Sequence, residues 1–474
     1  MNVNKIKIKT FIAGMVMLMY ACKKDEQQFV YDKINDLTIE NTSTTFTVAA
    51  LDDLIITPKL IESQPEGETY DYAWTISTAA IPTMGTDVIS REKDLKFKVE
   101  LSPGKYTFIF KATSKKTGIA ALSRYTVTVN GAFYGGWYVV GNKDGKLDLS
   151  LIRTDDVIFN NPIETVNKKS YPGKALSAYY QSDLGLIYFF SDQGAYRFNG
   201  NDLLELTNTS GTLPGFTSLP FKTAPYYQVS FVDVFPNITD QWIVADGGLY
   251  AGIGPLFYPN EVLKPFSERL SGDYDLFPGV FPASLSVIYF YDNKNKKFMQ
   301  TTYGGRDIGN ATATSTSFNM ADVGKTMIAF DRGVIATHEY YYIMENTTGR
   351  YLMSTVGASP GINLLIANSP EINIAKNFAT SSITKQLYYT VDNKIYLYEI
   401  TTNASRLIYS FPQGSLIKDI EMLRSSSKQL IVATNQGSTG EVYYFDIDAI
   451  GEFVDGTYTK KFGGFGEIVQ VTPR

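Results

Sequence analysis

The sequence is poor in the side chains that carry most enzyme chemistry. Its 474 residues include one cysteine, Cys22, and one histidine, His338. A single cysteine excludes an internal disulfide and a cysteine-based zinc site, and a single histidine excludes a metal site with two histidine ligands. A Ser-His-Asp triad would have to use His338. That residue lies at the entry to a strand-like segment, 335–342, where a structural or surface role explains it better than a role as a base.

Charged residues are also scarce, at 19% of the chain, and the basic ones form no cluster. The formal net charge is −5, and loss of the three lysines that precede Cys22 would change it to −8. Nucleic-acid binding requires a basic footprint, so we expect no nucleic-acid partner.

The beginning of the chain has the layout of a secretory signal. Three lysines are followed by an uncharged, largely apolar stretch at 10–21, which is too short for a helix that spans a bilayer, since that needs about 20 residues. Leu18 and Ala21 suit the box that precedes the cysteine of a bacterial lipoprotein, whereas Tyr20 is bulky for its position. This resemblance implies cleavage before Cys22, lipidation of Cys22 and a lipid anchor in the outer membrane. A buried N-terminal helix is the alternative.

The residues after Cys22 are charged, namely Lys23, Lys24, Asp25 and Glu26. They are similar to the short signal that sends lipoproteins of Bacteroidetes to the outer face of the outer membrane. We therefore expect a lipid-anchored protein that faces the extracellular side. The start of a solvated linker would explain the same residues.

Residues 37–131 are predicted to form an immunoglobulin-like β-sandwich. Short segments of alternating polarity recur there, as expected for strands with one buried face, and Trp74 lies on a central one. The segments are 44–48, 70–76, 95–99, 106–112 and 123–129. Residues 1–21 would be the signal peptide and 22–36 the lipidated tether.

The rest of the chain, 132–474, repeats one unit of two apolar segments joined by a tight polar turn. The turns centre near 144, 193, 247, 294, 348, 393 and 437, about 44 to 54 residues apart, which is the range of four-stranded propeller blades. The predicted fold class is therefore all-β, with a sandwich followed by a β-propeller of seven blades. Six or eight blades, or a set of unrelated antiparallel sheets, are the alternatives.

The ends of the repeat region predict how the propeller closes. The last full unit has a strand at 417–423 before its hairpin, whereas the first hairpin, at Trp137, has no strand before it. The C-terminal segment 466–472 has no hairpin of its own. We expect it to complete the first blade, because closure removes the exposed edges of an open sheet.

Three segments together resemble the PKD-like family lipoproteins of Bacteroidetes. They are 72–76 (YAWTI), 103–108 (PGKYTF) and 134–140 (YGGWYVV). The resemblance provides no catalytic motif to transfer, and from the residues themselves we expect no metal ion and no cofactor. It implies a genomic and cellular context, since such lipoproteins are associated with a SusC/SusD-like transporter, a channel with its lid lipoprotein.

The long connection 253–284 provides the candidate binding residues. Exposed aromatic side chains there could stack on a glycan, contact a peptide ligand or dock on a partner protein. Packing of the same rings onto the propeller is the alternative. The candidates are Phe257, Tyr258, Phe266, Tyr274, Phe277 and Phe281.

Carboxylates for a two-acid glycosidase are present in loops, at Asp155, Asp156, Glu268, Asp273 and Asp275, but their spacing selects no pair. We therefore expect a non-enzymatic accessory subunit of a SusC/SusD-like nutrient-uptake system. A histidine-independent glycoside hydrolase or lyase and a structural or adhesion protein are the alternatives. A buried acidic pair at the mouth of the propeller channel would favour the enzyme.

Overall fold

The computed structural model describes residues 35–64, 67–77, 87–182, 185–206, 221–229, 241–252, 266–284, 287–302 and 307–474. The described chain is nearly all β and forms two compact units, the second of which contains Val129–Arg474. Several predicted site residues lie outside the described residues: Cys22, Lys23, Lys24, Asp25, Glu26, Phe257 and Tyr258.

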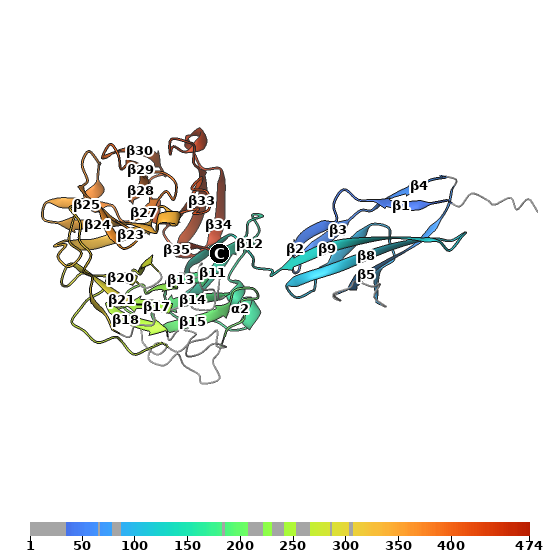
Figure 1. Cartoon of the computed structure of the whole chain (residues 1–474), viewed down its shortest axis with the longest axis horizontal. Helices are drawn as coiled ribbons and strands as arrows, with labels where there is room; N and C mark the ends of the chain where they lie inside the picture. Colours follow the sequence, from blue (N-terminus) through green and yellow to red (C-terminus); the bar gives the residue numbers. More distant parts are fainter. Residues whose placement is uncertain are drawn as a thin grey trace, which may run out of the picture. The chain divides into compact units, whose positions relative to one another are not determined.

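The first unit is a sandwich with one large sheet and two strand pairs (Figure 1). The large sheet has the order β2-β9-β8-β5-β6, and the pairs are β1-β4 and β3-β7. The strands are β1 (Leu37–Glu40), β2 (Thr45–Ala49), β3 (Asp53–Ile56), β4 (Lys59–Glu62), β5 (Tyr70–Ser77), β6 (Val88–Ser90), β7 (Leu95–Lys98), β8 (Gly104–Ser114) and β9 (Ala120–Asn130).

Trp74 is the centre of the sandwich core, as the alternation of β5 predicts. Its side chain is fully buried, its ring centroid lies 4.8 Å from that of Phe110 and 5.4 Å from that of Tyr125, and its Nε1–H donates to the carbonyl of Glu92 at 3.1 Å. A buried indole thus finds both apolar contacts and a hydrogen-bond acceptor.

In the described residues, the second unit contains seven antiparallel sheets arranged around a common centre (Figure 1). The first four consist of β35 (Glu467–Pro473), β10 (Trp137–Lys143), β11 (Lys146–Ile152) and β12 (Ile158–Phe159); β13 (Ala175–Gln181), β14 (Leu186–Ser191) and β15 (Gly194–Asn199); β16 (Tyr226–Val229), β17 (Gln241–Ala245) and β18 (Gly248–Gly252); and β19 (Phe281–Ser284), β20 (Val287–Asp292), β21 (Lys297–Thr302) and β22 (Gly309–Asn310). The last three consist of β23 (Thr326–Arg332), β24 (Glu339–Asn346), β25 (Gly349–Val356) and β26 (Ser359–Leu365); β27 (Phe378–Thr380), β28 (Gln386–Val391), β29 (Lys394–Glu399) and β30 (Ala404–Ser410); and β31 (Leu416–Met422), β32 (Gln429–Gln436), β33 (Thr439–Asp446) and β34 (Lys460–Phe465).

The C-terminal strand closes the ring, as predicted. Strand β35 pairs antiparallel with β10, from Trp137 opposite Pro473 to Asn142 opposite Glu467. It therefore serves as the first strand of the first sheet, although it is the last strand of the chain. It also contacts the first strands of the neighbouring sheets, β13 and β31.

All seven predicted hairpins form, and their turns explain the polar residues between the apolar segments. Asp144 and Gly145 have φ values of 52° and 74°, and Asp246 and Gly247 have values of 45° and 73°. Positive φ at both central residues gives the twist that two-residue hairpins need, and Asp-Gly tolerates it.

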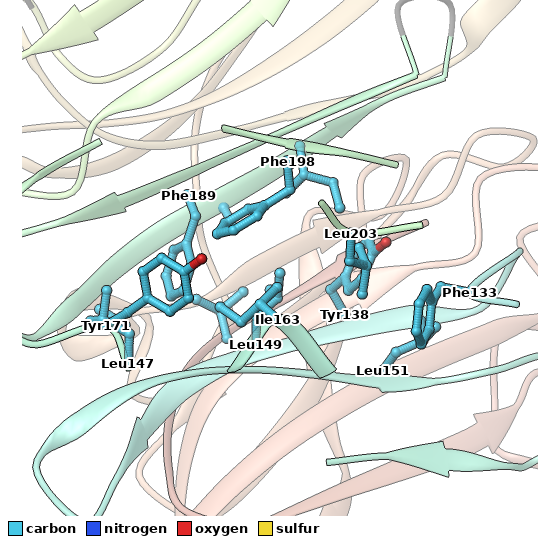
Figure 2. Packing of buried hydrophobic residues seen from close by; sticks show 14 of the residues in the cluster. Phe133, Tyr138, Leu147, Leu149, Leu151, Ile163, Tyr171, Phe189, Phe198 and Leu203 are labelled. Carbon is cyan, nitrogen blue, oxygen red and sulfur yellow. The ribbon is translucent and has the colours of Figure 1, made fainter. Parts of the chain in front are cut away.

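The sheets are held together by apolar residues between their faces. Between the first two sheets, Tyr138 and Leu149 of β10 and β11 pack with Phe189 and Phe198 of β14 and β15 (Figure 2). Ile163, from the short helix α2 (Pro162–Asn167), completes this cluster. The helix lies in the connection between β12 and β13.

The axial cluster, a candidate functional site

The aromatic residues of the long connection are not exposed where the structure describes them. The exposed fractions of Phe266, Tyr274 and Phe281 are 3%, 5% and 0%, and Phe277 is half-buried. Phe281 contacts Phe330 with ring centroids 4.8 Å apart. The expectation of an exposed aromatic platform is therefore wrong for these residues, because the rings fill the propeller core instead.

The loop carboxylates have surface roles. Asp155, Asp156, Glu268, Asp273 and Asp275 are all exposed. Three of them form ion pairs, Asp155 with Arg153 at 2.8 Å, Asp156 with Lys460 at 2.7 Å, and Asp273 with Lys294. They are scattered over the propeller and form no acidic pair.

His338 occupies a turn. It is half-buried, has a left-handed backbone with φ of 50°, and ends the short helix η1 (Ile335–Thr337), where its backbone N–H donates to the carbonyl of Ile335 at 3.0 Å. Its position just before β24 is consistent with a structural role.

A different set of acidic residues meets at the centre of the propeller. Strand β31 alternates buried Ile420 and Met422 with half-buried Asp419 and Glu421. The apolar side chains pack into the core shared with the sixth sheet, so the strand pleat places both carboxyls on its opposite face. We call Asp331, Asp419, Glu421, Arg424 and Tyr226 the axial cluster.

Asp419 fastens the last sheet to the first. Its Oδ2 accepts the backbone N–H of Val471 at 2.9 Å and its Oδ1 accepts that of Ile420 at 3.0 Å. Gln470 makes the corresponding contact to the second sheet, where its Oε1 accepts the N–H of Ala178 at 2.8 Å. The first strands of three successive sheets are thus joined through side-chain oxygens.

Asp331 fastens the fifth sheet to the sixth and seventh. Its Oδ2 accepts the backbone N–H of Thr380 at 2.6 Å, and its Oδ1 accepts the N–H of Arg332 at 2.7 Å and forms an ion pair with Arg424. Arg424 also donates to the carbonyls of Arg332 and Thr380. Both oxygens of Asp331 are therefore occupied.

Aromatic rings from opposite sides of the propeller reach the same centre. The ring centroid of Tyr226 lies 5.2 Å from that of Tyr179 and 5.2 Å from that of Phe330. Burial is the main cause that raises the pKa of Tyr226, and the charges of Glu421 and Asp331 raise it further. Asp331 of the fifth sheet and Glu421 of the seventh therefore lie near a ring of the third sheet.

Burial favours the protonated forms of Asp419 and Glu421. It raises the pKa of Asp419 to about 7, against the effect of two backbone N–H donors. For Glu421, burial raises the pKa well above its ordinary value, the charges of Asp419 and Asp331 raise it further, and Arg424 opposes the rise.

Glu421 differs from the other two acids of the axial cluster in its hydrogen bonding. Within the part of the chain that the structure describes, its carboxyl makes no hydrogen bond, whereas Asp331 and Asp419 are engaged at both oxygens. A neutral carboxyl can both donate and accept a hydrogen bond, so Glu421 beside Tyr226 suits an uncharged polar ligand.

Sequence reasoning missed these acids although their signal was visible. Asp419 and Glu421 are two residues apart in the segment predicted to be the inner strand of the last unit. Two acids that alternate with apolar residues in an inner strand point to the propeller axis. Asp331 gave no such signal. It is preceded by Phe330 but followed by the polar Arg332, so apolar and polar residues do not alternate around it.

The described residues include neither a cluster of metal ligands nor a long apolar helix. No group of three or more ligating side chains there could hold a metal ion. No helix in the described ranges has both the length and the apolar character to cross a membrane.

The comparisons with known proteins address the family and the fold. The model described as "PKD-like family" matches residues 22–175. No curated protein matches the chain. A quinonprotein alcohol dehydrogenase-like protein from Bacteroides thetaiotaomicron is 12% identical, with 91% of this chain and 96% of that chain covered and a TM-score of 0.46. Hsv2 from Kluyveromyces lactis is 7% identical, with 72% and 99% covered and a TM-score of 0.39.

The sheets and the family match define a protein with a PKD-like region followed by a seven-bladed propeller. The part of the chain that matches the PKD-like family model contains residues 72–76 and 103–108, the segments whose resemblance predicted this family.

Proposed function

We propose that this protein is a non-enzymatic, lipid-anchored protein of the cell surface that captures a nutrient ligand for a SusC/SusD-like uptake system. Lipidation at Cys22 and export by Lys23–Glu26 are the parts of this proposal that come from the sequence. The observation that supports ligand capture is Glu421, a carboxyl without a hydrogen bond in the described structure, at the centre of the propeller beside Tyr226.

The preferred ligand is a neutral glycan. A protonated Glu421 presents one donor and acceptors to sugar hydroxyls, and Tyr226 is half-buried, so solvent reaches the same group of side chains. A peptide ligand is the alternative.

A glycoside hydrolase is the second candidate, because the axial cluster contains half-buried acids with raised pKa values, as such an enzyme needs. Retaining and inverting enzymes both use two carboxyl groups with free oxygens facing the substrate. Asp331 and Asp419 have both oxygens bound by backbone or arginine donors, which leaves Glu421 without a second acid. This favours binding over hydrolysis.

An oligosaccharide-binding assay tests the proposal. The mature protein is titrated with neutral oligosaccharides from starch, cellulose, xylan and mannan, and the chain lengths are analysed afterwards. We expect one class to bind and to remain uncut. Glu421→Gln keeps the size of the side chain but loses the carboxyl, and should weaken binding about tenfold, the effect of roughly one hydrogen bond to a polar group.

Glu268→Gln is the matched control, because Glu268 is an exposed glutamate away from the axial cluster. Its affinity should equal that of the wild type. Shortened oligosaccharides would favour the hydrolase, and binding that is equal in Glu421→Gln would contradict a site at the axial cluster.

A further inference from the structure

Arg197 is a charged residue buried between the second and third sheets. Its exposed fraction is 6%, and its Nη1 has no hydrogen-bond partner. It lies on β15 opposite Tyr188 of β14, and Tyr188 belongs to the apolar cluster that joins these two sheets. A guanidinium in such surroundings is costly unless a counter-charge accompanies it.

The other buried arginines show how this protein meets that requirement. Arg153 is 3% exposed and pairs with Asp155 at 2.8 Å, and Arg350 is 7% exposed and pairs with Glu345 at 3.6 Å. Among the residues that the structure describes, no carboxylate forms an ion pair with Arg197. It differs from both in this respect.

The nearby tyrosines do not supply the missing negative charge. Burial raises the pKa of Tyr188 to about 12, with Arg197 opposing the rise, and raises that of Tyr227 well above its ordinary value. Both phenols are therefore neutral at pH 7. Their hydroxyls donate to Oε1 of Gln241, at 3.2 Å and 2.9 Å.

Gln241 adds a second unsatisfied donor. It is fully buried, and its Nε2 has no hydrogen-bond partner in the described structure, although its Oε1 accepts two bonds. Tyr188 pairs with Arg197 across β14 and β15, and its hydroxyl donates to Gln241, so both unsatisfied donors belong to residues next to Tyr188. Buried donors are almost always paired, with protein, water or an ion.

We propose that a compact monovalent anion, a halide or a small carboxylate, binds between the second and third sheets at Arg197 and Gln241. The anion supplies the counter-charge that the described residues do not provide there. It accepts hydrogen bonds from the guanidinium and the amide. This site is separate from the axial cluster and has a structural task, since it joins two sheets.

Thermal unfolding at constant ionic strength tests the proposal. Gluconate, a bulky anion, is replaced stepwise by chloride, formate or sulfate. We expect the melting temperature of the wild type to rise with chloride or formate, as mass action requires for a ligand of the native state, and not with sulfate. Arg197→Met should abolish the rise and should melt no lower than the wild type in gluconate alone.

Arg350→Met is the control, because it breaks a buried ion pair but leaves the proposed site intact. It should melt lower than the wild type and keep the dependence on chloride. If Arg197→Met does not fold, Arg197→Lys replaces it, and the shift should then shrink but remain. A bromide-soaked crystal should show an anomalous peak beside Arg197. The proposal would be overturned if the melting temperature of the wild type did not depend on the anion. It would also be overturned if Arg197→Met kept this dependence in full.

Discussion

At the residue scale, the axial cluster separates acids that hold the fold from one that does not. Asp419 and Asp331 bind backbone N–H groups of the neighbouring sheets, and these hydrogen bonds offset part of the cost of burying their charges. Glu421 shares the burial but has no such bonds in the described structure. Its ionisation therefore opposes folding, which is a measurable property.

Glu421→Gln should stabilise the protein at pH 8. The pKa of Glu421 is raised in the folded state, so between about pH 4, where a free glutamate titrates, and the folded-state pKa the native protein holds more protons than the unfolded chain. Stability from this group is present below that window and falls as the pH rises through it. We expect Glu421→Gln to exceed the wild type by about 1 kcal/mol at pH 8 and to match it near pH 4.

Chemical denaturation at pH 4, 6 and 8 provides the measurement, and Glu268→Gln provides the matched control. Because Glu268 is exposed, its replacement should leave the profile unchanged. A wild-type profile that rises from pH 4 to pH 8 in step with Glu421→Gln would contradict the raised pKa.

Asn435 offers a second test at this scale. It is 4% exposed, its Nδ2 donates to the carbonyl of Ile468 at 2.9 Å, and its Oδ1 accepts the N–H of Ile468 at 3.0 Å. Asn435→Ala leaves both backbone groups of the closing strand unsatisfied. We expect a loss of about 2 to 4 kcal/mol in the free energy of unfolding, from one or two buried groups without partners. A loss below about 0.5 kcal/mol, the level of an ordinary surface change, would contradict this role.

At the element scale, the closing strand β35 links the two ends of the propeller. It pairs with β10 and contacts β31, so it contributes to both the first and the last sheet. Its core side chains, Ile468 and Val471, are fully buried. Without it, β10 would be an exposed edge, which is prone to pair with other chains.

A chain that ends at Phe465 should therefore lose the closed propeller. We expect it to aggregate or to unfold over a broad temperature range, as seen by light scattering and differential scanning calorimetry. Addition of a peptide of residues 466–474 should restore a single cooperative transition. A truncated chain that melts like the full chain would show that β35 does not close the ring.

The sequence predicts those features of the fold that depend on residues close together in the chain better than those that depend on distant residues. Hairpins are local, so Asp144-Gly145 and Asp246-Gly247 identified their turns without any tertiary information. The closing strand could be predicted because counting the units left one strand unpaired. The fate of Phe266 and Phe281 could not, since an aromatic-rich loop reads the same whether it packs inward or outward.

The candidate site could not be predicted without knowledge of the three-dimensional fold. Asp331 and Glu421 are 90 residues apart, and only closure of the ring brings them to one centre, where each raises the pKa of Tyr226. The unpaired state of Arg197 likewise follows from what surrounds it between two sheets and not from its neighbours in sequence.

At the scale of the whole molecule, the central claim is that the protein works as a surface-anchored subunit of an uptake system. The sandwich and propeller give it two compact units, and the segment before residue 35, which contains Cys22, supplies the proposed anchor. The claim joins a location to a partner, so a measurement on the native membrane tests both together.

That measurement is co-purification of the tagged protein from native outer membranes in mild detergent, with mass spectrometry of the partners and of the lipidated N-terminus. We predict recovery of an acylated chain that begins at Cys22, in stoichiometric amounts with a TonB-dependent channel and its lid lipoprotein. Cys22→Ser should abolish both the acylation and the recovery of these partners. Recovery of the acylated protein alone, without a channel protein, would contradict the claim.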